Sequence, residues 1–130
     1  MAKKKRKQKI KSVKHDAGKP RLSLLSAISL FQTAEVMTHG EKVYGTHNWR
    51  SSGFKWTRIG DSALRHLNMW LAGMDNDPDT GLSNLAHLQC CIMFLQEQSL
   101  TKKHLDDRYK LPKKVLEQLY PAKKKAKRKK

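Results

Sequence analysis

Apolar side chains recur every three or four residues in three long stretches of this chain, which is the spacing of one face of an α-helix. The stretches run from about Leu22 to Tyr44, from Trp56 or Thr57 to Ala72, and from about Gly81 to Gln98. Gly40 favours a bend or break in the first helix. The sequence therefore predicts an all-α fold, a small helical bundle in which the second and third helices form a hairpin.

The same spacing assigns an inward face to each helix. In the third helix a second row of Asn84, His87 and Cys91 runs beside the inward face. The residues predicted to face inward are Leu22, Leu25, Ile28, Phe31, Ala34 and Val36 in the first helix, Ile59, Ala63, Leu64, Leu67, Trp70 and Leu71 in the second, and Leu85, Leu88, Ile92 and Leu95 in the third.

The segments between the helices are rich in turn-forming and polar residues. Residues 45–55 combine Gly, Ser and Asn with aromatic side chains, and such loops often carry binding groups. Trp49 and Trp56 suit either base stacking or anchoring of the loop, and anchoring is the better supported role from residues alone. After Thr101, a possible helix cap, one or two short helices are expected on either side of Pro112.

Charge is concentrated at the two ends. The formal net charge is +17, of which eight Lys and Arg residues lie in 1–14 and seven in 122–130, so these ends carry +15 and the body is nearly neutral. Dense blocks of like charge bury nothing. We therefore expect disordered Lys-rich tails at 1–15 and 122–130, a helical domain at 16–100 and short C-terminal helices at 101–121.

Two adjacent cysteines, Cys90 and Cys91, stand in an apolar helical run. Neighbouring helix positions point about 100° apart and are poorly placed to form a disulfide. We expect two small buried thiols and a reducing compartment. Neither an apolar run of membrane-spanning length nor a signal peptide is present in this sequence, so a cytoplasmic location is expected.

Candidate chemistry centres on the hairpin, where the turn MDNDPDTG places Asp75, Asp77 and Asp79 near His66 and His87. Clustered carboxylates favour Mg²⁺ or Mn²⁺. A calcium-binding EF-hand would need Gly where Thr80 stands, and zinc lacks usable Cys spacing. From the residues alone, a surface ion pair of Asp61 with Arg65 and a core role for His87 remain alternatives to a site.

Residues 18–97 resemble the phage and bacterial dATP/dGTP diphosphohydrolases, which are similar in style to the MazG-like all-α nucleotide pyrophosphatases. The matching pieces are GKPRLSLL, the pattern Gly-x-Lys-x-Tyr-Gly-x-x-Asn-Trp-Arg from Gly40, ALRHL, GMDNDPDTGLSNLAH and FLQE. The resemblance implies hydrolysis of a purine deoxynucleoside triphosphate to monophosphate and pyrophosphate with Mg²⁺ or Mn²⁺. It also implies control of the nucleotide pool during phage infection, in the host cytoplasm.

The resemblance implies roles for individual residues of this chain. Three positions depart from the family pattern, which commonly has Glu at Met74 and one or two His at Ser83 and Asn84. Our assignment of roles gives catalysis to Asp61, Arg65, His66 and His87, substrate binding to Lys42, Asn48, Trp49 and Arg50, and metal binding to Glu35, Asp61, Asp77 and Asp79.

Two other function classes remain open from the sequence. A non-catalytic relative would act as a nucleic-acid-associated protein, because fifteen tail charges bind phosphate without sequence preference. A structural all-α interaction module would need no metal. The expected partners are a deoxynucleoside triphosphate, further copies of the chain, since so small a core is marginal alone, and nucleic acid at the tails, with no membrane.

Overall fold

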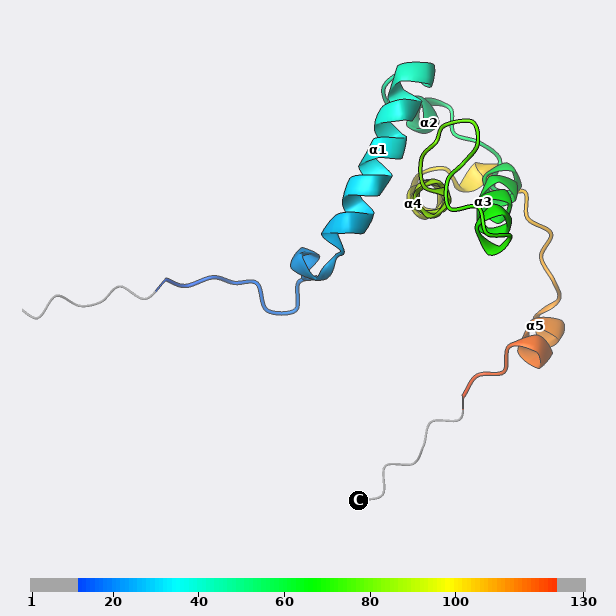
Figure 1. Ribbon diagram of the computed structural model, residues 1–130. Coiled ribbons are helices and arrows are strands. Elements are labelled where there is room, and N and C mark those ends of the chain that lie inside the picture. The colour runs from blue at the N-terminus through cyan, green and yellow to red at the C-terminus, as the bar shows by residue number, and fades with distance from the viewer. Residues whose placement is uncertain (1–11, 124–130) are drawn as a thin grey trace, which may run out of the picture.

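The computed structural model describes residues 12–123, and in this range it contains helices and no strand (Figure 1). The all-α prediction is confirmed. The predicted tails lie mostly outside the described residues. The elements are a 3₁₀ turn η1 (Leu22–Leu24), α1 (Ala27–Tyr44), α2 (Asn48–Ser51), α3 (Trp56–Leu71), α4 (Asn84–Thr101), a second 3₁₀ turn η2 (Lys103–Leu105) and α5 (Lys113–Leu119).

Helices α3 and α4 form the predicted hairpin, and α1 crosses α4 (Figure 1). His66 near the end of α3 meets Asn84 at the start of α4, so the two helices run antiparallel. The α1–α4 contact surrounds a core of Val36, Ala86 and Cys90, with Met37, Leu82 and Phe94 packed against it. The Thr33 hydroxyl also donates to Gln89 on α4 at 2.7 Å.

The first helix begins later than the pattern predicts. The chain turns through η1, and Ser26 then caps α1 by accepting a hydrogen bond from the Ser29 N–H at 3.2 Å. A serine at this position satisfies a backbone donor that the first turn of a helix leaves free. The predicted break near Gly40 is wrong, because α1 continues to Tyr44.

The third predicted helix is shifted toward the C-terminus. Ser83 caps α4 by accepting from the Ala86 N–H at 3.3 Å, so residues 81–83 belong to the preceding turn. Thr101 does not cap the next element. It is the last residue of α4, and its hydroxyl donates to the carbonyl of Glu97 at 3.0 Å.

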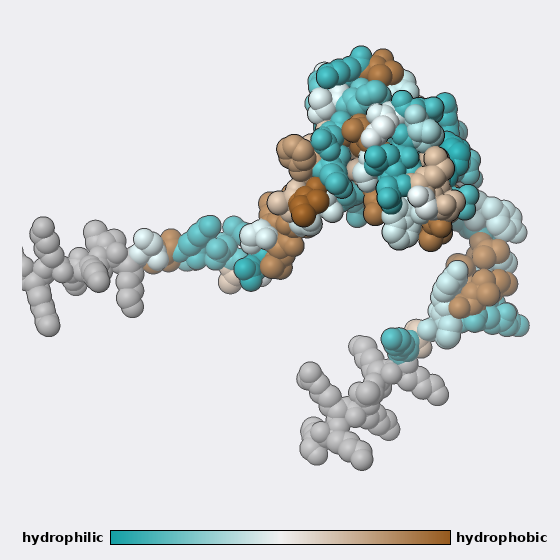
Figure 2. Space-filling model, in the orientation of Figure 1, coloured by the Kyte–Doolittle hydropathy of each residue, from teal (hydrophilic) through white to brown (hydrophobic). Residues whose placement is uncertain are grey.

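Most of the predicted inward faces are wrong for a single chain. Val36 and Ile59 are buried, but Leu64 is 65% exposed and Ile92 46% exposed. Apolar side chains outside the core are visible along the N-terminal half of α1 in Figure 2. The predicted inward residues that are exposed are Leu22, Leu25, Ile28, Phe31, Ala34, Leu64, Trp70, Leu71, Leu85 and Ile92. Periodicity identified these faces, but the fold of one chain does not cover them.

The loop after α1 packs on the C-terminal half of α4. Trp49 and Trp56 are buried, which confirms the anchoring role. The Phe54 N–H donates to the side chain of the buried Gln98, and Thr57 donates twice to Asp107 beyond the end of α4. These contacts lie at the open end of the hairpin, where α3 begins and α4 ends, and they tie it to the segments that flank it.

Both cysteines are free and buried, as predicted. Burial raises the pKa of the Cys90 thiol to about 12, so this thiol stays protonated and behaves as a small core side chain. Among the described helices, none has the length and apolar content needed to cross a membrane.

Gly53 offers a test of the loop packing. It has φ +71°, and an added Cβ would lie 2.6 Å from Leu105 Cδ1. We expect Gly53→Ala to lower the free energy of unfolding by about 1–2 kcal/mol, because L residues are strained in this region. Gly60→Ala is the control: Gly60 lies inside α3 with open space around it, so alanine should stabilise the chain by up to ~1 kcal/mol. Chemical denaturation measures the free energy of unfolding of both variants. Equal changes in the two variants would contradict the packing of the loop around Gly53.

Candidate active site

The turn between α3 and α4 is organised around the carboxylate of Asp77, which is only 7% exposed. Asp77 Oδ1 accepts from the Asp79 N–H at 3.0 Å, from the Thr80 N–H at 2.9 Å and from the Thr80 hydroxyl at 3.2 Å. The Asp77 N–H donates to the Leu82 carbonyl at 2.7 Å. Burial alone would raise the pKa of Asp77, but these hydrogen bonds and nearby His87 outweigh it and lower the pKa.

Asn84 links this turn to α3. It is fully buried; its Nδ2 donates to the Met74 carbonyl at 2.9 Å, and its Oδ1 lies 2.9 Å from His66 Nδ1. Because the amide oxygen can only accept, His66 carries its proton on Nδ1. His66 Nδ1 also lies 3.8 Å from Asp77 Oδ2. Asn84 therefore fixes the orientation of the neighbouring imidazole.

His87 is held by Thr80. Its Nε2 lies 2.8 Å from the Thr80 hydroxyl oxygen, and that hydroxyl already gives its proton to Asp77. His87 Nε2 is therefore the donor. The rings of His66 and His87 stack 4.5 Å apart and nearly parallel, at 9°. Burial, and then the proximity of His66, lower the pKa of His87 despite the opposing effect of Asp77. His87 is accordingly neutral at pH 7.

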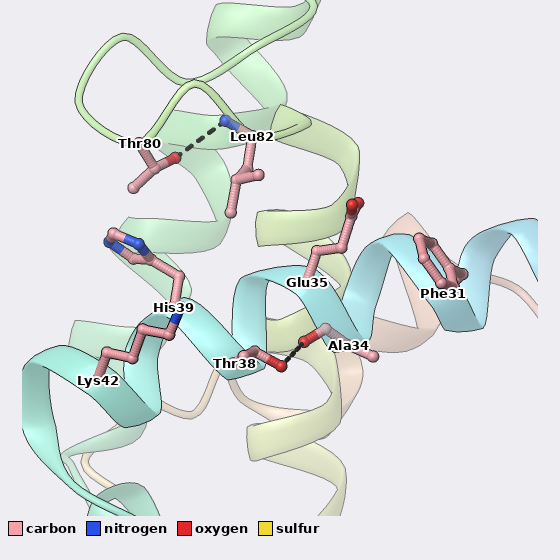
Figure 3. A pocket seen from close by; sticks show the side chains of 8 residues that line it. All are labelled: Phe31, Ala34, Glu35, Thr38, His39, Lys42, Thr80 and Leu82. Atoms are coloured by element: carbon pink, nitrogen blue, oxygen red, sulfur yellow. Dashed lines mark hydrogen bonds between the residues drawn. The ribbon is translucent and has the colours of Figure 1, made fainter.

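A groove of about 400 Å³ lies between α1 and this turn (Figure 3). Glu35, His39 and Lys42 line it from α1 at spacings of four and three, so they share one side of the helix. Thr80 lines the opposite side and connects the groove to Asp77 and His87. In Figure 3 the Glu35 carboxylate and the His39 ring both point from α1 toward the turn.

The predicted substrate loop is docked on α4. Trp49 stacks on Phe94 with ring centroids 4.5 Å apart, and the Arg50 guanidinium lies over the Trp49 ring. Arg50 Nε and Nη2 donate to the Glu97 carboxylate at 2.9 Å each, and Nη1 donates to His47 Nδ1 at 3.0 Å. The hydrogen bonds from Arg50 lower the pKa of Glu97. The guanidinium is thus engaged within the chain.

The four predicted metal ligands come from three parts of the structure, which are α1, α3 and the Asp77 turn. Glu35 lines the groove on α1, and Asp61 lines a different groove between α3 and α4. Asp77 uses one oxygen inside the turn, and Asp79 is exposed. Within residues 12–123 no three His, Cys, Asp or Glu side chains come together to hold a metal ion. Because Mg²⁺ is often held by only one or two carboxylates together with substrate phosphates, the predicted Mg²⁺ or Mn²⁺ stays a prediction.

The structure thus brings together only part of the predicted site. Glu35 and Lys42 share a groove, and Asp77, His66 and His87 form the network behind it. Sequence reasoning missed His39 and Thr80. A turn of the form Asp-x-x-Thr could have indicated Thr80, because an Asp side chain often accepts from backbone two or three residues on. Asp79 lies in the Asp77 turn but is exposed, and the predicted residues outside this region are Asn48, Trp49 and Arg50 on α2 and Asp61 and Arg65 on α3.

The half-buried His87 predicts a pH dependence of stability. Its pKa is lower in the folded chain than in the unfolded chain, so the unfolded chain binds the proton more readily. We expect the melting temperature to fall as pH drops from ~7.5 to ~5.5, the range in which a free His titrates. Asp77, with its lowered pKa, loses its contribution only below about pH 4. His87→Gln should flatten the change; an equal slope in both proteins would contradict the assignment.

Comparison with known proteins completes the description of the site. The family model "dATP/dGTP diphosphohydrolase, N-terminal" matches residues 9–108. A curated relative, the dATP/dGTP diphosphohydrolase of Salmonella phage PMBT28, is 36% identical over 83 residues, which cover 64% of this chain and 28% of the relative. No solved structure matches the chain. The chain spans little more than a quarter of that relative. Because the family model matches well over half of the chain, including the whole groove and the turn behind it, the chain belongs to the dATP/dGTP diphosphohydrolase N-terminal family.

Proposed function

We propose that this chain hydrolyses a purine deoxynucleoside triphosphate, dATP or dGTP, to the monophosphate and pyrophosphate, with the nucleotide bound in the groove between α1 and the Asp77 turn. The observation that carries the proposal is the placement of Glu35, His39 and Lys42 on one side of α1, opposite Thr80. The name of the phage relative and the family model support the substrate class.

Substrate binding follows from the chemistry of the groove. The Lys42 ammonium and the His39 imidazole offer donors to the triphosphate oxygens. Phe31, at the other end of the groove, is 70% exposed and offers a flat apolar surface on which a purine can stack. In this arrangement the base lies toward the N-terminal end of α1 and the phosphates lie toward its C-terminal end.

Hydrolysis then needs a base that accepts a proton from water. In the proposal the Glu35 carboxylate takes one proton while the water oxygen forms a bond to the α-phosphorus. The bond between the α-phosphorus and the bridging oxygen breaks, and pyrophosphate leaves with both electrons of that bond. The network of Asp77, Thr80, His87 and His66 acts as positioning, because it fixes the wall of the groove that faces Glu35.

Whether hydrolysis needs a divalent metal is left to experiment in this proposal. The carboxylates predicted to bind Mg²⁺ or Mn²⁺ are dispersed in the described residues, so no step is assigned to the metal. Assays with Mg²⁺, with Mn²⁺ and with a chelator measure whether turnover depends on either ion. Asp61→Asn tests its predicted metal role separately, since Asp61 lies outside the groove.

The groove proposal predicts two kinetic effects. Glu35→Gln removes the base and should lower kcat by about 10²- to 10⁴-fold, with little change in KM. Lys42→Met removes a charged donor to phosphate and should raise KM by roughly 10- to 100-fold. Resolving dNMP and pyrophosphate from dATP and dGTP gives both parameters. Glu41→Gln, on the same helix but paired with Thr46, is the matched control and should retain activity. Full activity of Glu35→Gln would refute the proposal.

The engagement of Arg50 predicts that it docks α2 and does not bind substrate. We expect Glu97→Gln to lower the melting temperature and Arg50→Met to lower it at least as much, since that change also loses the contacts with Trp49 and His47; the double variant should be no worse than Arg50→Met, because both changes break the same pair. KM should stay unchanged in all three. A rise in KM confined to Arg50→Met would instead support the role in substrate binding predicted from the sequence.

A further inference from the structure

Helix α4 has an apolar stripe that the rest of the described chain covers only in part. Leu85, Leu88, Ile92 and Leu95 are spaced three, four and three residues apart, which is the seam spacing of two packed helices. Leu85 is 43% exposed and Ile92 is 46% exposed, while Leu88 and Leu95 are half-buried. We call these four residues the α4 stripe. Contiguous exposed apolar surface of this kind marks an interaction site.

Helix α4 itself carries no formal charge along the α4 stripe. From Asn84 to Gln96 the helix contains no Asp, Glu, Lys or Arg, although 30% of the chain is charged. A helix face that is meant for water is usually polar or charged. The absence of charge also means that two copies of this face can approach each other without repulsion.

We propose that a second copy of this chain docks on the α4 stripe, with the two α4 helices antiparallel about a two-fold axis. Two-fold contacts join the same patch on both subunits, so the patch must be self-complementary. An axis at the level of Ile92 places Ile92 against Ile92 of the partner subunit. It places Leu88 against Leu95 of the partner subunit, and the reverse, so the stripe fills its own gaps.

The charges on the neighbouring helix fit the same axis. Asp61 and Leu64 of α3 lie beside Leu95 and Gln96 of α4 in one groove. Asp61 and Arg65 are one helical turn apart, both are exposed, and neither forms an ion pair in the described part of the chain. Because α3 and α4 are antiparallel neighbours, the axis that exchanges Leu88 and Leu95 also brings Asp61 toward Arg65 of the partner subunit. Opposite charges then border the apolar seam on both sides.

The mass of the full chain in solution tests the proposal, by sedimentation velocity over a range of concentrations. We expect a reversible dimer that Ile92→Lys converts to monomer while circular dichroism keeps its helical content. Leu119→Lys is the matched control, since Leu119 is 58% exposed on α5 and lies away from the stripe; its dimer should persist. A wild-type monomer at all concentrations, or a dimer unaffected by Ile92→Lys, would overturn the proposal.

A charge exchange tests the two-fold axis itself and does not depend on the apolar variant folding. Asp61→Arg alone and Arg65→Asp alone place like charges opposite each other and should each weaken dimerisation more than ~tenfold. The double variant restores opposite charges across the axis and should regain the wild-type dissociation constant. If the double variant does not regain dimerisation, the partner does not dock about this axis and the proposal is overturned. The proposal is also overturned if the chain is monomeric and Ile92→Lys instead abolishes a complex with a different macromolecule. These readouts are masses, so failure of hydrolysis leaves them unaffected.

Discussion

The Asp77 carboxylate is the point on which the geometry of the hairpin depends. A turn of twelve residues between two antiparallel helices leaves many backbone donors without helical partners. Asp77 accepts two of the nearest ones and the Thr80 hydroxyl, and Asn84 holds the Met74 carbonyl from the other side. Because Thr80 then holds His87 and Asn84 holds His66, the same few hydrogen bonds fix both imidazoles and one wall of the groove.

This network also explains why the departures from the family pattern need not disrupt the turn. Ser83 caps α4, which a serine does well. Asn84 uses its amide as a donor to Met74 and as an acceptor from His66, and an amide supplies both functions at once. Met74 contributes only its carbonyl to this network, so its side chain is free to differ.

The sequence was sufficient for the existence and type of the three long helices, because periodicity depends on local spacing. It was not sufficient for their inward faces. Leu85 and Ile92 have the spacing of a buried row, yet α4 buries Ala86 and Cys90 against α1. Helical spacing identifies an apolar face that needs to be covered. It does not identify the element or subunit that covers it. The groove could not be predicted from the sequence either, since Glu35 and Thr80 meet only because α1 crosses α4 beside the turn. The same limit applies to the predicted metal ligands, which come from α1, α3 and the turn: the sequence does not fix how these elements cross, and their role stays a prediction.

The two proposed surfaces occupy different sides of α4, and this separation follows from helix geometry. At 3.6 residues per turn, the α4 stripe is nearly opposite Ala86 and Cys90, which face α1. A second copy on the stripe would therefore leave the groove between α1 and the Asp77 turn open to a nucleotide. It would also support α4 from the side that a single chain covers only in part. The core around Val36, Ala86 and Cys90 is small, so the position of the groove wall depends on how firmly α4 is held. Covering the stripe stabilises that wall without narrowing the entrance for substrate.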